Sequence, residues 1–173
     1  MPMSLHIRRM ELGDAETIAG AFLPLGWPGK TAEQFERYLR EQCAGQRDVL
    51  TAWQNDVFCG YLTIVWQPDY LPLRETGIPE IQDFNVLPDK RRQGIGTALM
   101  NQAESLVSER TPLIGIGVGL YADYGAAQRL YVRRGYVPDG LGVTYHDRPV
   151  TPGEAVPVDD DLVLHFTKIV RND

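Results

Sequence analysis

Residues 86–100 constrain this chain more than any other stretch, because they join the end of a strand, a basic glycine turn and an amphipathic helix. The segment reads VLPDKRRQGIGTALM. Gly94 and Gly96 allow the backbone to approach a bound group closely, and a helix start offers N–H groups and the positive end of the helix dipole. Three basic residues at 90–92 add positive charge at the same place. The layout therefore suits a pyrophosphate group.

Composition sets the class of protein. A chain of 173 residues is long enough for one domain, residues 1–173, with a sizeable core. Apolar residues make up 43% and charged residues 23%, as in ordinary soluble globular proteins. A net charge of −6 argues against a nucleic-acid or membrane-surface partner. We therefore expect neither a nucleic-acid nor a membrane partner.

The chain gives no sign of a membrane segment, a secretory signal or a metal site. It has no apolar run of about 18 residues, and its N-terminus lacks a long apolar core. Cys43 and Cys59 have no CxxC partners, which predicts two reduced and mostly buried thiols. The three histidines are scattered without the spacing of metal ligands. We expect a cytoplasmic protein without a metal.

Hydropathy periodicity predicts alternating strands and helices, which together form a mixed sheet flanked by helices. Predicted helices cover 14–22, a segment after Thr31 that includes Cys43, 94–109 and 124–134. Predicted strands cover 5–10, 48–54, 57–67, 79–87, 113–120, a segment from about 136, and 161–169. Loops are expected over 68–78 and 138–160, which contain several prolines.

Local signals support these boundaries. Asp14 is expected to cap the first helix, and Thr31 with Gln34 has the pattern of a capping box. Residues 55–56 predict a tight turn between two strands, and Gly135 is expected to end a helix in the left-handed conformation.

The pattern Arg91-x-x-Gly94-x-Gly96 resembles the acetyl-coenzyme A signature of the GNAT superfamily of N-acetyltransferases. The segment YGAAQRLYVRRGY at 124–136 resembles the late helix of that family, with matches at Ala127, Leu130 and Tyr131. The resemblance covers about residues 4–169. It implies an α/β (α+β) fold with a mostly antiparallel twisted sheet, about four helices, and a splay in the sheet where coenzyme A enters.

The resemblance also implies a binding site for acetyl-coenzyme A as co-substrate. Val86 and its neighbours would bind the pantetheine arm through the backbone, and the turn that follows would hold the pyrophosphate through main-chain N–H groups. The residues implied are Phe84, Val86, Arg91, Arg92, Gln93, Gly94, Ile95, Gly96, Thr97, Tyr124 and Tyr131.

Tyr131 occupies the position at which the family often protonates the departing thiolate. A phenol suits this step because its ordinary pKa of about 10 exceeds the value of about 8.5 for a thiol. The alternative is a core tyrosine with a structural role. Many family members carry Asn seven residues earlier, where this chain has Tyr124, so that contact to the coenzyme stays open.

The family often places a general base on the strand before the pyrophosphate turn. Glu80 and Asp83 are the two carboxylates there. Alternation on a strand puts Glu80, Phe84 and Val86 on one face and Asp83 on the other, unless a bulge reverses the order. Parity thus favours Glu80, with Asp83 or a water-mediated base as alternatives.

The function implied is transfer of an acetyl group from acetyl-coenzyme A to a primary amine of a small molecule or peptide. A non-catalytic module that senses acyl-coenzyme A is the alternative, and a longer acyl donor stays open. Aromatic residues near 22–38 would line either the acceptor pocket or the core. Glycines at 115, 117 and 119 are expected to allow close packing. Family members are often dimers, and a homodimer stays open for this chain.

Overall fold

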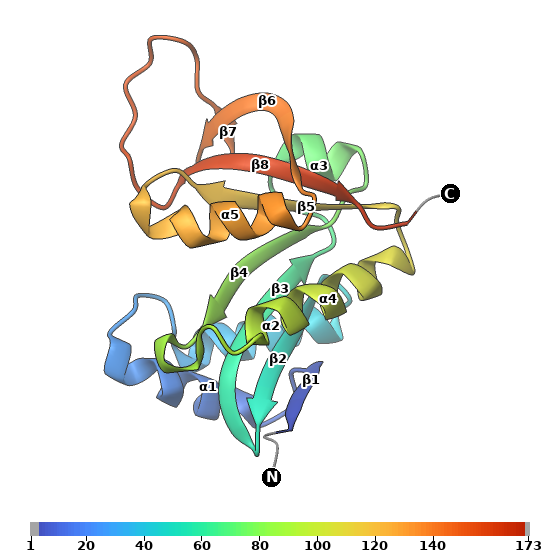
Figure 1. Ribbon diagram of the computed structural model, residues 1–173, viewed down its shortest axis with the longest axis vertical. Coiled ribbons are helices and arrows are strands. Elements are labelled where there is room, and N and C mark those ends of the chain that lie inside the picture. The colour runs from blue at the N-terminus through green and yellow to red at the C-terminus, as the bar shows by residue number, and fades with distance from the viewer. Residues whose placement is uncertain (1–3, 172–173) are drawn as a thin grey trace. The chain divides into compact units, whose positions relative to one another are not determined.

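The computed structural model describes residues 4–171. They form two compact units, shown in Figure 1. The first unit comprises Met1–Trp66 and Gln82–Leu106, and the second comprises Gln67–Ile81 and Val107–Asp173. Strand β4 (Glu80–Val86) begins in the second unit and continues in the first.

The first unit carries strands β1, β2, β3 and most of β4, hydrogen-bonded in that order. The first three are β1 (Leu5–Arg9), β2 (Arg47–Gln54) and β3 (Val57–Val65). Both β1–β2 and β2–β3 are antiparallel. Asn55 and Asp56 have φ values of 48° and 64°, which suits the predicted two-residue hairpin turn.

The helices of the first unit lie beside these strands (Figure 1). They are α1 (Asp14–Phe22), the short 3₁₀ turn η1 (Leu23–Leu25), α2 (Ala32–Cys43) and most of α4 (Ile95–Ser108). Helices α1 and α2 pack on each other, and α2 contacts β2. Phe22, Phe35 and Tyr61 are fully buried between these elements, and the rings of Phe35 and Tyr61 have centroids 5.2 Å apart. Aromatic packing therefore builds this core.

One predicted cap is wrong and the other is confirmed in part. Gly13, in the left-handed conformation, is the N-cap of α1, while Asp14 is its first residue. The Asp14 carboxylate instead accepts two hydrogen bonds of 2.7 and 2.9 Å from Arg8. Thr31 caps α2, and its hydroxyl accepts the N–H of Gln34 at 3.3 Å. The Gln34 side chain donates to a tyrosine further along α2.

The second unit begins with α3 (Leu71–Glu75) and the first residues of β4. Its other elements are β5 (Leu113–Gly119), the 3₁₀ turn η3 (Ala122–Tyr124), α5 (Gly125–Arg133), β6 (Val137–Tyr145), β7 (Arg148–Pro149) and β8 (Leu162–Ile169). The strand order is β4-β5-β8-β6-β7. The β4–β5 pair is parallel, whereas β5–β8, β6–β8 and β6–β7 are antiparallel. The expected mixed, mostly antiparallel sheet is confirmed.

Two of the expected loops contain regular structure. Residues 68–78 include α3, a fifth α-helix beside the four expected, with a proline in its first turn where the missing N–H costs nothing. Residues 138–149 form β6 and β7, joined by a turn at His146 and Asp147 with φ values of 50° and 60°. A long loop over 150–161 does lead from β7 to β8, as Figure 1 shows.

The glycines of β5 serve close packing, as predicted. A Cβ on Gly115 would lie 2.5 Å from a methyl group of Leu73, and a Cβ on Gly119 would lie 2.4 Å from the ring of Tyr124. Neighbouring side chains therefore pack directly on β5. A residue larger than glycine at these positions would displace them.

Three observations on the described residues concern membrane spans, metal-binding clusters and the two thiols. Within residues 4–171, no helix is both long and apolar enough to cross a bilayer. The same residues contain no cluster of three metal-binding side chains. Cys59 is buried as expected, but Cys43, the last residue of α2, is exposed.

Candidate active site

The turn between β4 and α4 has the geometry of an anion-binding loop within the first unit. Arg92 and Gly94 both adopt positive φ, at 58° and 80°, on either side of one residue. Helix α4 then begins at Ile95, and its first helical bond runs from the N–H of Ala98 to the carbonyl of Gly94 at 2.9 Å. The preceding N–H groups have no acceptor within the helix, so they are available to a bound anion.

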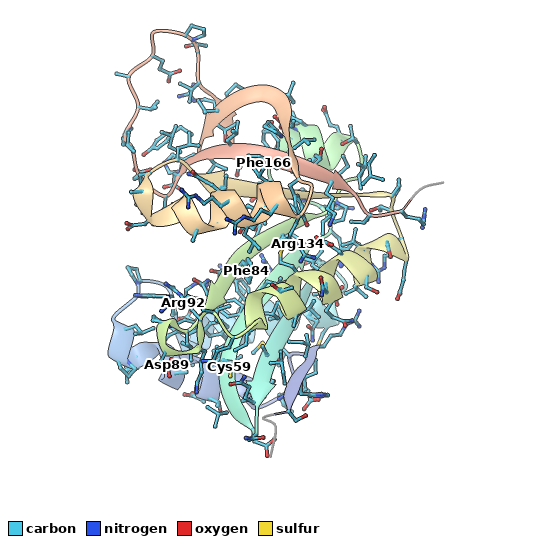
Figure 2. All side chains as sticks on the ribbon, in the orientation of Figure 1. Cys59, Phe84, Asp89, Arg92, Arg134 and Phe166 are labelled. Atoms are coloured by element: carbon cyan, nitrogen blue, oxygen red, sulfur yellow. The ribbon has the colours of Figure 1, made fainter. Side chains whose placement is uncertain are left out.

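Two side chains brace this turn. The Arg91 Nε donates to the carbonyl of Val86 at 3.1 Å, and the Gln93 amide donates to the carbonyl of Asp89 at 3.2 Å. Arg92 is exposed in the same turn, where Figure 2 labels it. These hydrogen bonds thus hold the turn in a shape that suits a bound anion.

Gly96 brings the start of α4 against β4. A Cβ on Gly96 would lie 3.3 Å from the ring of Phe84 and 3.8 Å from a methyl of Val86. Phe84 and Val86 therefore share one face of β4, as strand parity predicts. Ile95 is buried, so only its backbone can contribute to binding, whereas the neighbouring Thr97 is exposed.

Asp83 lies on β4 in a conformation that ordinary strand residues do not adopt. Its φ of 53° marks a local irregularity of the kind that the parity argument left open. Asn85 donates to the Asp83 carboxylate at 2.8 Å, and Tyr38 donates to it at 3.0 Å. Tyr61 and Lys30 also donate to this carboxylate. The carboxylate therefore accepts from donors on three elements, α2, β3 and β4, and from the loop before α2.

These donors control its ionisation. Burial alone would raise the pKa of Asp83, but the Lys30 ammonium and the tyrosine hydroxyls outweigh burial and hold the pKa below its ordinary value. The same burial and the charge of Asp83 raise the pKa values of Tyr61 and Tyr38. Asp83 is therefore an ionised and weakly basic group, better suited to hold a cation than to remove a proton.

Glu80 lies in a second polar cluster, within the second unit. Its side chain is buried, with Oε1 3.3 Å from Nε2 of His165 on β8. Asp147 Oδ1 lies 3.8 Å from the same nitrogen. The imidazole stacks on the ring of Tyr70 with centroids 3.6 Å apart, and the Tyr70 hydroxyl donates to Asp139 at 2.7 Å.

Two carboxylates thus share one buried imidazole. Burial and repulsion from Glu80 raise the pKa of Asp147, while His165 opposes that rise. Nδ1 of His165 is buried and has no hydrogen-bond partner among the described residues. A buried cluster of titratable groups of this kind is a candidate functional site.

Tyr131 lies on α5 in the second unit, with 5% of its surface exposed. Its ring is 6.0 Å from that of Tyr136. Burial raises its pKa well above the ordinary value for a phenol, without a contribution from any described charge or hydrogen bond. The hydroxyl is therefore protonated at neutral pH and has a proton to give.

The hydroxyl of Tyr124 is engaged in a hydrogen bond within the second unit. Its hydroxyl donates to Asp160 at 2.8 Å, and the hydroxyl of Tyr121 donates to the same carboxylate. Its ring covers Gly119. Asp160, in the turn before β8, therefore accepts two tyrosine hydroxyls.

The structure therefore groups the predicted residues within each unit. In the first, β4, the turn and the start of α4 gather Asp83, Phe84, Val86, Arg91, Arg92, Gln93, Gly94, Ile95, Gly96 and Thr97. The second holds Glu80, Tyr124 and Tyr131. Sequence reasoning missed Lys30, Tyr61 and His165, because each makes its polar contacts to residues far away in the chain.

Comparison with known proteins bears on this site. The model of the acetyltransferase (GNAT) family matches residues 14–136, which is more than half of the chain. No curated protein matches the sequence.

Solved structures resemble the whole chain. A protein assigned to the GNAT family from Desulfovibrio desulfuricans has a TM-score of 0.73 at 19% identity, over 97% of this chain and 100% of the other. Aminoglycoside 6'-acetyltransferase type Ii has a TM-score of 0.68 at 18% identity, over 97% and 99%. Spermidine N-acetyltransferase from Vibrio cholerae, in complex with coenzyme A and spermine, has a TM-score of 0.64 at 16% identity, over 95% of each chain. At these identities the likeness shows the fold.

Proposed function

Because the chain belongs to the acetyltransferase (GNAT) family, we propose that it transfers an acetyl group from acetyl-coenzyme A to a primary amine. One observation carries the coenzyme part of this proposal. The start of α4 is packed on Phe84 through Gly96, and its N–H groups follow a turn with two left-handed residues. A Cβ at Gly96 would narrow the space between the start of α4 and Phe84. The backbone N–H groups at this helix start are donors of the kind that a pyrophosphate needs.

The residues fit distinct parts of the coenzyme. The N–H groups of Gly94, Gly96 and Thr97, with Arg92, would hold the pyrophosphate. The backbone of β4 around Val86 would bind the pantetheine arm, and Arg91 would leave the Val86 carbonyl when that arm binds. Acetyl-coenzyme A supplies an acetyl group activated as a thioester.

The chemistry asks three things of the chain. A base takes a proton from the acceptor ammonium, so that the nitrogen lone pair can form the new C–N bond. A backbone N–H near Val86 stabilises the negative charge that develops on the acetyl oxygen. An acid protonates the sulfur as the C–S bond breaks, and the second proton lost by the acylated nitrogen restores that acid. We assign the base to Glu80 and the acid to Tyr131, and we assign Asp83 to holding the acceptor cation.

The acceptor is proposed as an amine that is cationic in solution. The similar structures include enzymes named for spermidine and for aminoglycosides, both of which carry several amines. The carboxylate, tyrosine and aromatic groups around Asp83 are chemically matched to such a cation.

Calorimetric titration with acetyl-coenzyme A, coenzyme A and NAD tests the proposal first. We expect micromolar binding of both coenzyme A species and none of NAD. A panel of polyamines, aminoglycosides and peptides, assayed by release of free thiol, then identifies the acceptor. Binding without acetyl transfer to any amine would favour an acyl-coenzyme A sensor. Absence of coenzyme A binding would remove the proposal.

A further inference from the structure

A buried carboxylate in the first unit holds an ammonium group that the chain itself supplies. Lys30 lies in the loop between η1 and α2, yet only 12% of its side chain is exposed. Its Nζ pairs with Asp83 and donates to the Tyr61 hydroxyl at 2.8 Å. The same nitrogen lies 5.9 Å from the ring centroid of Phe22 and 5.4 Å from that of Tyr61. The ammonium is thus surrounded by a carboxylate, a hydroxyl and two aromatic faces.

We call this arrangement the ammonium cage, formed by Phe22, Tyr38, Tyr61, Asp83 and Asn85. These residues come from α1, α2, β3 and β4. They also bond to one another, because Tyr38, Tyr61 and Asn85 all donate to Asp83. The cage is therefore fixed by the fold without Lys30, which preorganises it for a cation.

Lys30 is attached differently from the rest. It follows a loop in which Gly26 and Gly29 both have positive φ, at 64° and 75°. Its ammonium is a point charge at the end of a four-carbon stem with several rotatable bonds. Lys30 is therefore the exchangeable member of the cluster, while the cage belongs to packed helices and strands.

We propose that the ammonium cage is the acceptor subsite of the enzyme, and that Lys30 occupies it as an internal competitor until a substrate ammonium displaces it. The proposal rests on the proposed function, which it deepens. The ligand class is a primary alkylammonium, because the cage offers two oxygen acceptors and aromatic faces to a cation with N–H donors. A quaternary ammonium has no such donors and could not replace the hydrogen bond that Lys30 donates to Asp83.

Replacement of Lys30 by alanine gives a sharp test. Lys30→Ala removes the atoms from Cγ to Nζ, which correspond to n-propylammonium. We expect propylammonium chloride, titrated by calorimetry without acetyl-coenzyme A, to bind Lys30→Ala at least about tenfold more tightly than wild type. Tetramethylammonium should not bind. The double variant Lys30→Ala/Asp83→Asn should lose propylammonium binding.

A second variant distinguishes an ammonium cage that is empty from one whose structure is disrupted. Lys30→Met keeps a long apolar stem in place of the lysine stem but carries no charge, so we expect it to fold and to bind no propylammonium. Where Lys30→Ala is unstable alone, propylammonium should raise its unfolding temperature and leave that of Lys30→Met unchanged. Equal effects on both variants, or none on Lys30→Ala, would overturn the cage as an ammonium site.

Kinetics then links the cage to the acceptor. With an amine that the thiol-release panel identifies, Lys30→Ala should lower KM for that amine, and propylammonium should compete with it. Propylammonium binding that leaves the acceptor KM unchanged would overturn the acceptor assignment. Propylammonium binding to a protein that acetylates no amine would overturn the proposed function, and the ammonium site would stand.

Discussion

At the scale of single residues, Tyr131 gives the most direct test of the chemistry. Its phenol is protonated at neutral pH, and a proton donor to the leaving sulfur contributes to turnover rather than to coenzyme binding. We expect Tyr131→Phe to lower kcat by about 100-fold with little change in KM for acetyl-coenzyme A. Steady-state kinetics with varied acetyl-coenzyme A measures both constants.

Tyr145→Phe is the matched control. It removes another phenol hydroxyl, one that donates to Asp159 at 2.9 Å. We expect kcat to stay near that of wild type in this variant. If Tyr131→Phe keeps full turnover as well, Tyr131 is a structural tyrosine and the acid lies elsewhere.

Glu80 and His165 define a second prediction at this scale. Glu80→Gln keeps the shape of the side chain but cannot take a proton, so kcat should fall by about 100-fold. His165 acts through Glu80 as a positioning residue, since its Nε2 lies 3.3 Å from the carboxylate. His165→Gln should therefore lower kcat less than Glu80→Gln and change the pH dependence of kcat/KM. If the pH profile of His165→Gln equals that of wild type, the histidine only fills space.

The residue scale also shows where sequence reasoning ends. Strand parity correctly placed Phe84 and Val86 together, because alternation is a local property. The contacts of Asp83 could not be predicted, because its partners Lys30 and Tyr61 are distant in the chain. Its φ of 53° also leaves no pattern in the sequence. Polar networks of this kind depend on tertiary packing rather than on spacing.

At the scale of elements, the approach of β3 to β4 is set by a residue without a side chain. A Cβ on Gly60 would lie 2.6 Å from the carbonyl oxygen of Asn85 and 3.0 Å from the Cα of Val86. Both contacts are to backbone, which cannot rotate away as a side chain would. We expect Gly60→Ala to destabilise the protein by about 1–3 kcal/mol in urea unfolding.

Gly20→Ala provides a control of opposite sign. Gly20 lies inside α1, and an added Cβ would meet no atom within 4 Å. Alanine is the better helix former, so this variant should be more stable by about 0.5–1 kcal/mol. If Gly60→Ala is as stable as Gly20→Ala in urea unfolding, β3 and β4 can move apart at Gly60 without a cost in free energy.

Elements with strong local signals were predicted well, and the others were not. Helix α1 starts and ends where its apolar periodicity predicted, and Gly135 takes the left-handed conformation expected of a helix end. A strand was expected from about 136, but most of β6 was assigned to the loop over 138–160 because the segment contains proline and two glycines. The strand is specified by its pairing with β8, which lies far along the chain.

At the scale of the whole molecule, stability should depend on acid through carboxylates that the fold keeps ionised. The pKa of Asp14 is lowered because its hydrogen bonds from Arg8 and from the backbone outweigh burial. The pKa of Asp83 is lowered because Lys30 and the tyrosines likewise outweigh burial. A carboxyl group with a lower pKa in the folded state binds fewer protons there than in the unfolded chain.

The sign of the effect follows from that difference. The contribution of each carboxylate is complete above the unfolded pKa near 3.8 and is lost as pH falls through the lower folded value. We therefore expect the free energy of unfolding to fall steeply below about pH 4, as measured by urea unfolding between pH 7 and 3. Asp14→Asn should be less stable at pH 7 but show a shallower decline in acid, because one of the titrating groups is gone. A decline as steep as that of wild type would mean that Asp14 has the same pKa in both states, and that other groups drive the unfolding in acid.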